Sequence, residues 1–160
     1  MPPTADHPNC RAVDAVLERA GAAGRVQILT DAAPTAAAAA ALLGVEVGAI
    51  ANSLVFATAQ DEPVLVMTSG AHRVDLAKAA QLLGSAALRR ADPEFVHAAT
   101  GQPIGGVAPV AHPTPLRTLV DEDLERYPQL WAAGGIPHAV FPTTFHELVR
   151  LTAGTPAAVA

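Results

Sequence analysis

The residues of this sequence best suited to chemistry are a polar pair inside an apolar run and a glycine pair further along the chain. Asn52 and Ser53 lie within IANSLVFAT, where a buried amide or hydroxyl needs hydrogen-bond partners. Gly105 and Gly106 open the segment GGVAPV, and paired glycines permit unusual dihedral angles or a close approach of the backbone to a ligand. Both features indicate a pocket that acts through hydrogen bonds. The alternatives are an amide buried within a strand and a tight turn that needs glycine only for its conformation.

Other familiar chemistry is absent from the sequence. The six histidines form neither HxH nor HExxH, no CxxC occurs, and a dedicated zinc site is therefore not expected. There is no GxxxxGK[ST], and the glycine pair lacks the GxGxxG spacing of a dinucleotide site. Ser69 lies in TSGAH, which is not the GxSxG element of hydrolases. We therefore expect no metal and no cofactor.

The elements that would position these residues follow from periodicity and from stop signals. Ala and Leu at helical spacing, with Gly after the last turn, predict helices over about residues 9–20, 36–43, 74–83, 92–101 and 143–151. Short apolar runs predict strands over about residues 26–29, 49–58, 64–67, 86–89, 117–120 and 138–141. Asn9 is the expected N-cap of the first helix, and the tail from Gly154 is expected to fray.

Helices and strands alternate irregularly and include at least one hairpin, which favours a single α+β domain with a mixed sheet over a doubly wound parallel sheet. We expect this mixed α/β domain to span residues 9–153, with a flexible N-terminus at residues 1–8 and a C-terminal tail at residues 154–160. A length of 160 residues with 51% hydrophobic residues suits one compact core.

Composition also limits the partners and the compartment. The net charge is −5 and Lys78 is the only lysine, which argues against a broad nucleic-acid surface. Cys10 is the only cysteine, so no internal disulfide can form, and we expect it to be a bland buried thiol in a reducing compartment. No signal peptide is expected, and the most apolar run, residues 36–45, is too short to span a bilayer. These features predict a cytoplasmic protein that does not bind membranes.

Three segments, in this order, carry a family resemblance. IANSLVF at residues 50–56 resembles a strand that usually contains Lys-Thr/Ser-Leu, and GGVAPV at residues 105–110 resembles a glycine-rich GG[IV][SA]P loop. The third segment is Ala133-Gly134-Gly135, followed by a strand and by a helix that contains Glu147. Together they resemble the YbaK/EbsC/ProRS-associated family, whose domains hydrolyse mischarged aminoacyl-tRNA, and the resemblance extends from about Cys10 to Thr152.

The resemblance implies a mixed, mostly antiparallel sheet with a barrel-like core flanked by helices. It also implies a pocket for the aminoacylated 3′ end of tRNA, trans-editing hydrolysis of an ester to a small amino acid, and a synthetase as a further partner. A hydroxyl of the tRNA end or a held water would be positioned beside the activated ester, while backbone N–H groups of the glycine loop stabilise the developing oxyanion. The catalytic residues expected on this basis are Asn52, Gly105, Gly106, Val107 and Ala108.

Further residues near these segments are expected to bind substrate: Ser53, Ser69, Arg73, Pro109, His112, Gly134, Gly135 and His138. Each has a structural alternative. Ser53 can satisfy a neighbour in the sheet, Arg73 can be a solvated residue at a helix start, and the two histidines can be surface or structural groups.

The sequence departs from the family pattern at three positions. Asn52 stands where the family usually has lysine, and an amide can donate and accept hydrogen bonds but carries no charge. Ala133 and Val140 stand where some members have serine and an acidic residue. These departures leave a second hypothesis open, a catalytically lapsed module that binds a tRNA end, a small ligand or a protein. A hydrolase acting on other esters is a third hypothesis, without sequence support of its own.

Overall fold

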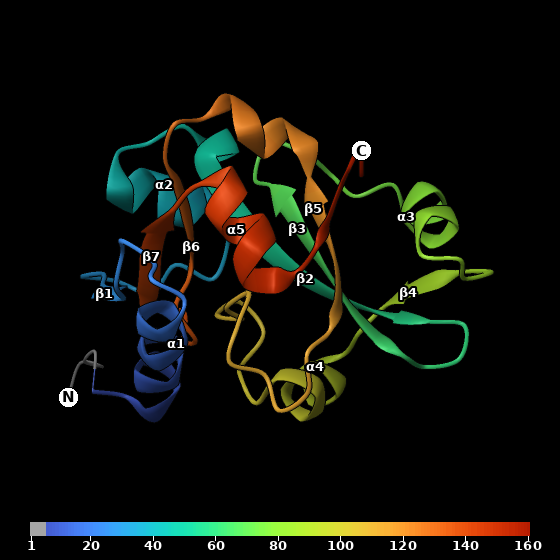
Figure 1. Cartoon of the computed structure of the whole chain (residues 1–160), viewed down its shortest axis with the longest axis horizontal. Coiled ribbons are helices and arrows are strands. Elements are labelled where there is room, and N and C mark those ends of the chain that lie inside the picture. The colour runs from blue at the N-terminus through green and yellow to red at the C-terminus, as the bar shows by residue number, and fades with distance from the viewer. Residues whose placement is uncertain (1–5) are drawn as a thin grey trace.

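We describe the protein from a computed structural model, which describes residues 6–160 (Figure 1). Five α-helices and two short 3-10 helices are present in this range. The α-helices are α1 Pro8–Arg19, α2 Ala36–Leu43, α3 Leu76–Leu82, α4 Pro93–Thr100 and α5 Phe145–Thr152. The 3-10 helices are η1 Val47–Ala49 and η2 Glu122–Arg126. The strands are β1 Gln27–Ile28, β2 Ile50–Thr58, β3 Pro63–Ser69, β4 Leu88–Arg90, β5 Arg117–Asp121, β6 Leu130–Ala133, β7 Ala139–Thr143 and β8 Thr155–Ala157.

The eight strands form one mixed sheet in the order β1-β7-β6-β2-β3-β5-β8, and β4 pairs with β2 outside this path. Four pairings are antiparallel, namely β1 with β7, β6 with β7, and β2 with β3 and β4. Three are parallel, namely β2 with β6, β3 with β5, and β5 with β8. The expected single domain with a mixed sheet and flanking helices is confirmed.

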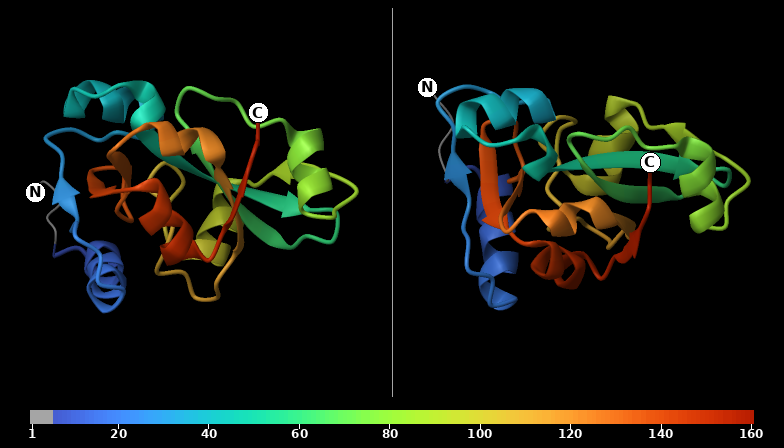
Figure 2. Two further views of the ribbon diagram at one scale, coloured as in Figure 1. Left: turned by 45° about the horizontal axis from the view of Figure 1, so that its top comes forward. Right: turned by 90° about the horizontal axis from the view of Figure 1, so that it is seen from above.

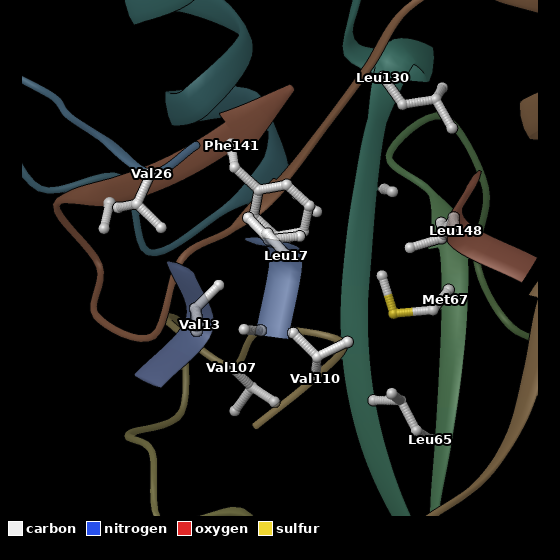
Figure 3. Close-up of a cluster of buried hydrophobic side chains, with 14 of the residues drawn as sticks. Val13, Leu17, Val26, Leu65, Met67, Val107, Val110, Leu130, Phe141 and Leu148 are labelled. Atoms are coloured by element: carbon white, nitrogen blue, oxygen red, sulfur yellow. The ribbon is translucent and has the colours of Figure 1, made fainter. Parts of the chain in front are cut away.

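The long hairpin of β2 and β3 runs through the molecule, and helices cover both of its faces (Figures 1 and 2). One face meets α1 and α5 in the largest apolar cluster, which includes Leu17, Met67, Phe141 and Leu148 (Figure 3). The other face is covered in two places. Phe56 packs with α3, whereas Ile50 packs with α2. The part of this face between α2 and α3 carries Asn52.

Several helix ends follow from local sequence. Thr35 Oγ1 accepts from the Ala38 N–H at 3.2 Å, Asp92 Oδ1 accepts from the Phe95 N–H at 2.8 Å, and both helices end at a left-handed glycine. The prediction of Asn9 as a cap is wrong. The N-cap of α1 is His7, whose Nδ1 accepts from the Asn9 N–H at 3.1 Å.

Two strands were not expected from the sequence. β6 is only four residues long, and all four are apolar, including the single tryptophan, Trp131. Its sequence therefore lacks the alternation of apolar and polar residues that indicates a strand. The expected frayed tail instead forms β8, which pairs with β5, and the side chain of Val159 is fully buried beyond it. Of the expected flexible N-terminus, residues 1–5 lie outside the described residues, and Pro8 already begins α1.

No helix within residues 6–160 is both long enough and apolar enough to cross a membrane.

Candidate active site

The site begins at an interruption in the sheet. On the edge away from β3, strand β2 pairs with β6 only at Ile50 and Ala51. It pairs with β4 only from Phe56 to Thr58. Between these two pairings, within residues 6–160, no strand lies against Asn52, Ser53, Leu54 and Val55 on this edge. A stretch of β2 in the middle of the sheet therefore has an open edge.

The hairpin register decides which backbone groups face this open edge. The Gly70 N–H donates to the Ile50 carbonyl at 2.8 Å, and the Thr58 N–H donates to the Glu62 carbonyl at 2.9 Å. In an antiparallel pair, every second residue directs its N–H and C=O toward the partner strand. The even-numbered residues of β2 therefore bond to β3, and Ser53 and Val55 direct their backbone groups into the gap.

Two cavities meet at this open stretch. The α2 cavity, of about 230 Å³, lies between α2, β6 and β2. The α3 cavity, of about 400 Å³, lies between β2, β4 and the segment before α3. They share the lining residues Asn52, Ser53, Leu54, Ile104 and Val107. Because the shared residues come from β2 and from the glycine-rich loop, these two segments form the junction of the two cavities.

The two cavities differ in chemistry. No charged side chain from the described part of the chain lines the α2 cavity; its walls include seven alanines, Ile50, Trp131 and Val140, and Thr35 is a polar residue among them. The α3 cavity has a mostly apolar lining, with Leu54, Phe56 and Val96 among its residues, but it also carries the basic side chains of His72, Arg73 and Arg90. The site therefore has an apolar compartment on one side of Asn52 and a basic compartment on the other.

The glycine-rich loop lies beside the open edge of β2, with Val107 and Val110 turned toward the core (Figure 3). Gly105 has φ of +85° and lines the α2 cavity. Gly106 packs closely against the peptide between Ile136 and Pro137. A side chain at position 106 would not fit, since its Cβ would lie 2.4 Å from the Ile136 carbonyl carbon. The first glycine thus serves conformation and the second serves close packing.

Hydrogen bonding divides the N–H groups of this loop into two sets. The Gly106 N–H donates to the Pro103 carbonyl at 3.0 Å, and the Ala108 N–H donates to Gln102 Oε1 at 2.7 Å. Both are therefore engaged, and the expectation that Gly106 and Ala108 offer oxyanion donors is not met by their geometry. The Gly105 and Val107 N–H groups have no hydrogen-bond partner among residues 6–160; Gly105 lines the α2 cavity and Val107 lines both cavities.

Asn52 is the polar side chain at the junction. It is half-buried, lines both cavities, and makes no side-chain hydrogen bond to any described residue. An amide left in this position can donate to and accept from a ligand at once. Its neighbour Ser53 points to the opposite face, where Oγ donates to Met67 Sδ at 3.2 Å, so only the Ser53 backbone lines the cavities.

The structure brings only some of the predicted binding residues to this site. Arg73 lines the α3 cavity. Ser69 is buried, and its Oγ donates to the Gly48 carbonyl at 2.8 Å. Pro109 and His112 line a separate hollow beside α1, on the far side of the loop. His112 Nε2 donates to the Ala108 carbonyl at 2.7 Å, and burial lowers the pKa of its imidazole, an effect that this hydrogen bond opposes.

The second glycine pair forms the turn between β6 and β7. The Gly134 N–H donates to the Ala139 carbonyl at 2.7 Å, and the Gly135 carbonyl accepts from Asn9 Nδ2 at 2.9 Å. His138 is half-buried, and its carbonyl accepts from the Leu29 N–H at 2.7 Å. None of the three lines either cavity, but this turn supplies the surface against which Gly106 packs.

Several residues of the site carry no sequence signal that singles them out. Gln102 is 2% exposed and holds the loop at three points, donating from Nε2 to the carbonyls of Val110 at 3.2 Å and Ala111 at 3.4 Å besides accepting from Ala108. Ile104, 54% exposed, stands at the rim that both cavities share.

Cys10 is buried, and burial together with the charge of Asp14 raises the pKa of its thiol, in keeping with an unreactive role.

Comparisons with known proteins agree with this geometry. The family model described as an aminoacyl-tRNA editing domain matches residues 30–151. A crystal structure of a candidate trans-editing enzyme for prolyl tRNA synthetase has 45% sequence identity and a TM-score of 0.88, over 96% of this chain and 97% of that one. The hypothetical protein APE2540 has 30% identity and a TM-score of 0.85, over 92% and 98% of the two chains.

Two further relatives are similar to this chain in sequence. The proline--tRNA ligase of Nitratidesulfovibrio vulgaris strain DP4 is 35% identical over 107 residues, which are 67% of this chain and 18% of the ligase. The chain thus spans less than a fifth of that relative's length. YwhH of Bacillus subtilis strain 168 is 32% identical over 110 residues, 69% of each chain. With the matched family model covering most of its length, this protein belongs to the aminoacyl-tRNA editing domain family.

Proposed function

We propose that this protein is a trans-editing deacylase, which hydrolyses the ester between an amino acid and the 3′ end of a tRNA. The observation that carries the proposal is the meeting of two unlike cavities at Asn52 and at the unengaged N–H groups of Gly105 and Val107. An aminoacyl-tRNA end has two unlike parts, a side chain and a nucleotide, joined at the bond to be cleaved. Family membership and the likeness to the candidate trans-editing enzyme support the same reaction.

The α2 cavity would receive the amino-acid side chain. Its volume of about 230 Å³ and its uncharged, alanine-rich walls favour a small uncharged side chain. Ala133 and Val140 both line it, so the two positions at which the sequence departs from some family members make this cavity more apolar. A cavity of this kind separates amino acids that differ by one methylene only modestly, which is why a second, editing encounter is useful.

Catalysis at the junction would rest on placement rather than on a strong base. The ester is already activated, and a water held beside it by the neighbouring ribose hydroxyl can attack its carbonyl, which releases the amino acid as the bond to the ribose oxygen breaks and that oxygen takes up a proton from the water. The developing oxyanion would accept from the free N–H groups of Gly105 and Val107. Asn52 would hold the attacking or the leaving oxygen through its amide, a role that needs no charge.

A second candidate function is a module that binds a tRNA end without hydrolysing it. The observation that favours it is the uncharged junction, since Asn52 supplies neither a proton acceptor of useful basicity nor a positive charge. Binding would then persist while turnover is absent, so a single assay that follows both separates the two functions.

The test is a deacylation assay at catalytic protein concentration, with tRNAs charged with Ala, Ser, Thr, Cys or Pro. We expect rapid loss of one or two mischarged species. For Asn52→Ala we expect a rate lower by roughly 10- to 100-fold, as for loss of one polar group at a reacting centre. Gln129→Ala, which removes an exposed amide outside both cavities, is the matched control and should leave the rate unchanged. Binding without turnover of any species would favour the second candidate.

A further inference from the structure

The α3 cavity has a charge that contrasts with the rest of the molecule. The protein carries a net charge of −5, yet this cavity is lined by Arg73, Arg90 and His72. No aspartate or glutamate of the described chain lines it. A cavity with two guanidinium groups and no carboxylate attracts an anion.

Arg73 and Arg90 are both free to bind an anion. Of the ten basic side chains, five have no hydrogen-bond or ion-pair partner among residues 6–160, namely Arg11, Arg19, Arg73, Arg90 and Arg126. The neighbouring Arg89, by contrast, pairs with Asp61 and lies over the ring of Phe95. Two of the five free groups line the same cavity, whereas Arg11 and Arg126 line neither this cavity nor the α2 cavity.

The backbone positions of these arginines are fixed. Arg90 lies directly opposite Phe56 in the pairing of β4 with β2, and its side chain therefore shares a face of the sheet with Phe56, Leu54 and Asn52. Arg73 follows His72, which is held at three points. Its ring nitrogens contact the carboxylates of Asp121 at 2.8 Å and Asp123 at 2.9 Å, and its backbone N–H donates to the Ser69 carbonyl at 2.9 Å. The arginine side chains can move, but their points of attachment are held on both sides of the cavity.

The distance along the strand fits one nucleotide. Phe56 lies four positions after Asn52 on β2, which corresponds to about 13 Å at a rise of about 3.3 Å per residue. Arg90 starts opposite Phe56 and lines the same cavity as Asn52, so its long side chain would extend over part of this span. A ribose with its ester at Asn52 and its 5′ phosphate toward the arginines would occupy the remainder.

We propose that Arg73 and Arg90 form a subsite for the phosphodiester group on the 5′ side of the terminal nucleotide of tRNA. The inference rests on the proposed function, because it assumes that the ester lies at Asn52. Guanidinium groups suit this ligand, since they donate paired hydrogen bonds to phosphate oxygens. The subsite would orient the nucleotide, so that its aminoacyl group enters the α2 cavity.

The test compares two minimal substrates, 3′-O-alanyl-adenosine and the same compound with a 5′ phosphate. Arg73→Gln and Arg90→Gln each remove one charge from the cavity, and Arg126→Gln removes an exposed charge elsewhere as the matched control. We expect each cavity substitution to raise KM for the phosphorylated substrate by roughly threefold to fivefold, the scale of an exposed charge-assisted contact. KM for the unphosphorylated substrate should not change. The wild-type preference for phosphate should also shrink as salt is added.

Equal effects on both substrates, or an equal effect of Arg126→Gln, would overturn the subsite. If the wild-type protein hydrolyses neither compound, the proposed reaction fails separately, and titration with AMP and with adenosine then decides the subsite. Tighter binding of AMP that both Arg73→Gln and Arg90→Gln remove would support it. Equal affinity for AMP and adenosine would contradict it.

Discussion

At the scale of single residues, the loop from Gly105 to Pro109 is held by the side chain of Gln102. This buried amide accepts from the Ala108 N–H and donates to the carbonyls of Val110 and Ala111, so one side chain connects three points of the backbone. By occupying the Ala108 N–H, it leaves Gly105 and Val107 as the residues between 105 and 108 whose N–H groups have no partner in the described chain. Gln102 touches neither cavity, and its role is that of a positioning residue.

Replacement of Gln102 by leucine should therefore affect both stability and activity. The change leaves the Ala108 N–H and the Val110 carbonyl buried without partners, and we expect the free energy of unfolding to fall by about 2–4 kcal/mol. Chemical denaturation measures this value. Gln102→Glu keeps the acceptor for Ala108 and should lose less, while Gln81→Leu, at an exposed position on α3, is the control. Unchanged stability and deacylation rate in Gln102→Leu would show that the loop holds its shape without this amide.

His112 should make stability depend on pH. Burial lowers its pKa in the folded protein below the value in the unfolded chain, so folding favours the neutral imidazole. The unfolded chain then binds the proton first as pH falls. The contribution to stability is present above the unfolded pKa, near 6.5, and is lost as pH falls toward the folded pKa.

Denaturation curves between about pH 7 and 5 measure this effect, which for one group cannot exceed about 1.4 kcal/mol per pH unit. We expect His112→Asn to lose part of the pH dependence of the wild-type protein in this range. Gln129→Asn, at an exposed position without an ionisable group, should retain the full dependence. A wild-type protein whose stability rises as pH falls through this window would contradict the assigned direction.

At the scale of the elements, the open edge of β2 decides how the strand tolerates proline. The Ser53 N–H faces the gap, whereas the Leu54 N–H belongs to the ladder with β3. Proline lacks an N–H group and is accepted in strands only where that group is unpaired. Ser53→Pro and Leu54→Pro, one residue apart, therefore form a matched pair.

We expect Leu54→Pro to lower the free energy of unfolding by at least about 2 kcal/mol, because it breaks a ladder hydrogen bond in the middle of the sheet. Ser53→Pro should stay within about 1 kcal/mol of the wild type, since the N–H group that it removes is unpaired and the only other loss is the weak contact of Ser53 Oγ with Met67 Sδ. Thermal unfolding followed by circular dichroism compares the two. Similar losses in both variants would mean that the edge at Ser53 is paired after all.

At the scale of the whole molecule, the C-terminal segment adds the last strand, β8, to one edge of the sheet. β8 pairs with β5, the side chain of Val159 is fully buried beside α3, and the Asp75 N–H donates to the Val159 carbonyl at 2.8 Å just before that helix. The loop that carries Arg73 lies immediately before this contact. The end of the chain thus helps to hold the segment of the α3 cavity that carries Arg73, which is distant from it in sequence.

Removal of the two methyl groups in Val159→Ala should cost about 2 kcal/mol, from lost apolar burial and the space left behind. Urea denaturation measures the change, and Ala158→Ser, at an exposed neighbour, is the control. A loss below about 0.5 kcal/mol would indicate that the segment lies loosely on the sheet, as a surface substitution would.

The sequence by itself determined the elements whose signals are local. Thr35 and Gly44 mark the ends of α2, Asp92 and Gly101 mark those of α4, and the alternation of apolar and turn residues marks the hairpin of β2 and β3. Each signal acts within a few residues of chain, through a cap, a left-handed glycine or a turn, and can therefore be recognised without the fold. The polar pair and the glycine pair likewise indicated the two segments that line the junction of the cavities.

Only the tertiary structure decided how these segments combine. The gap between β6 and β4, the orientation of Asn52 and Ser53 to opposite faces, and the occupation of the Ala108 N–H by Gln102 depend on contacts between residues distant in sequence. β6 and β8 are short, and their strand conformation comes from pairing rather than from residue type. The two cavities lie between elements that are distant in sequence, so their position and shape follow from how those elements pack and not from the amino-acid sequence of any one segment.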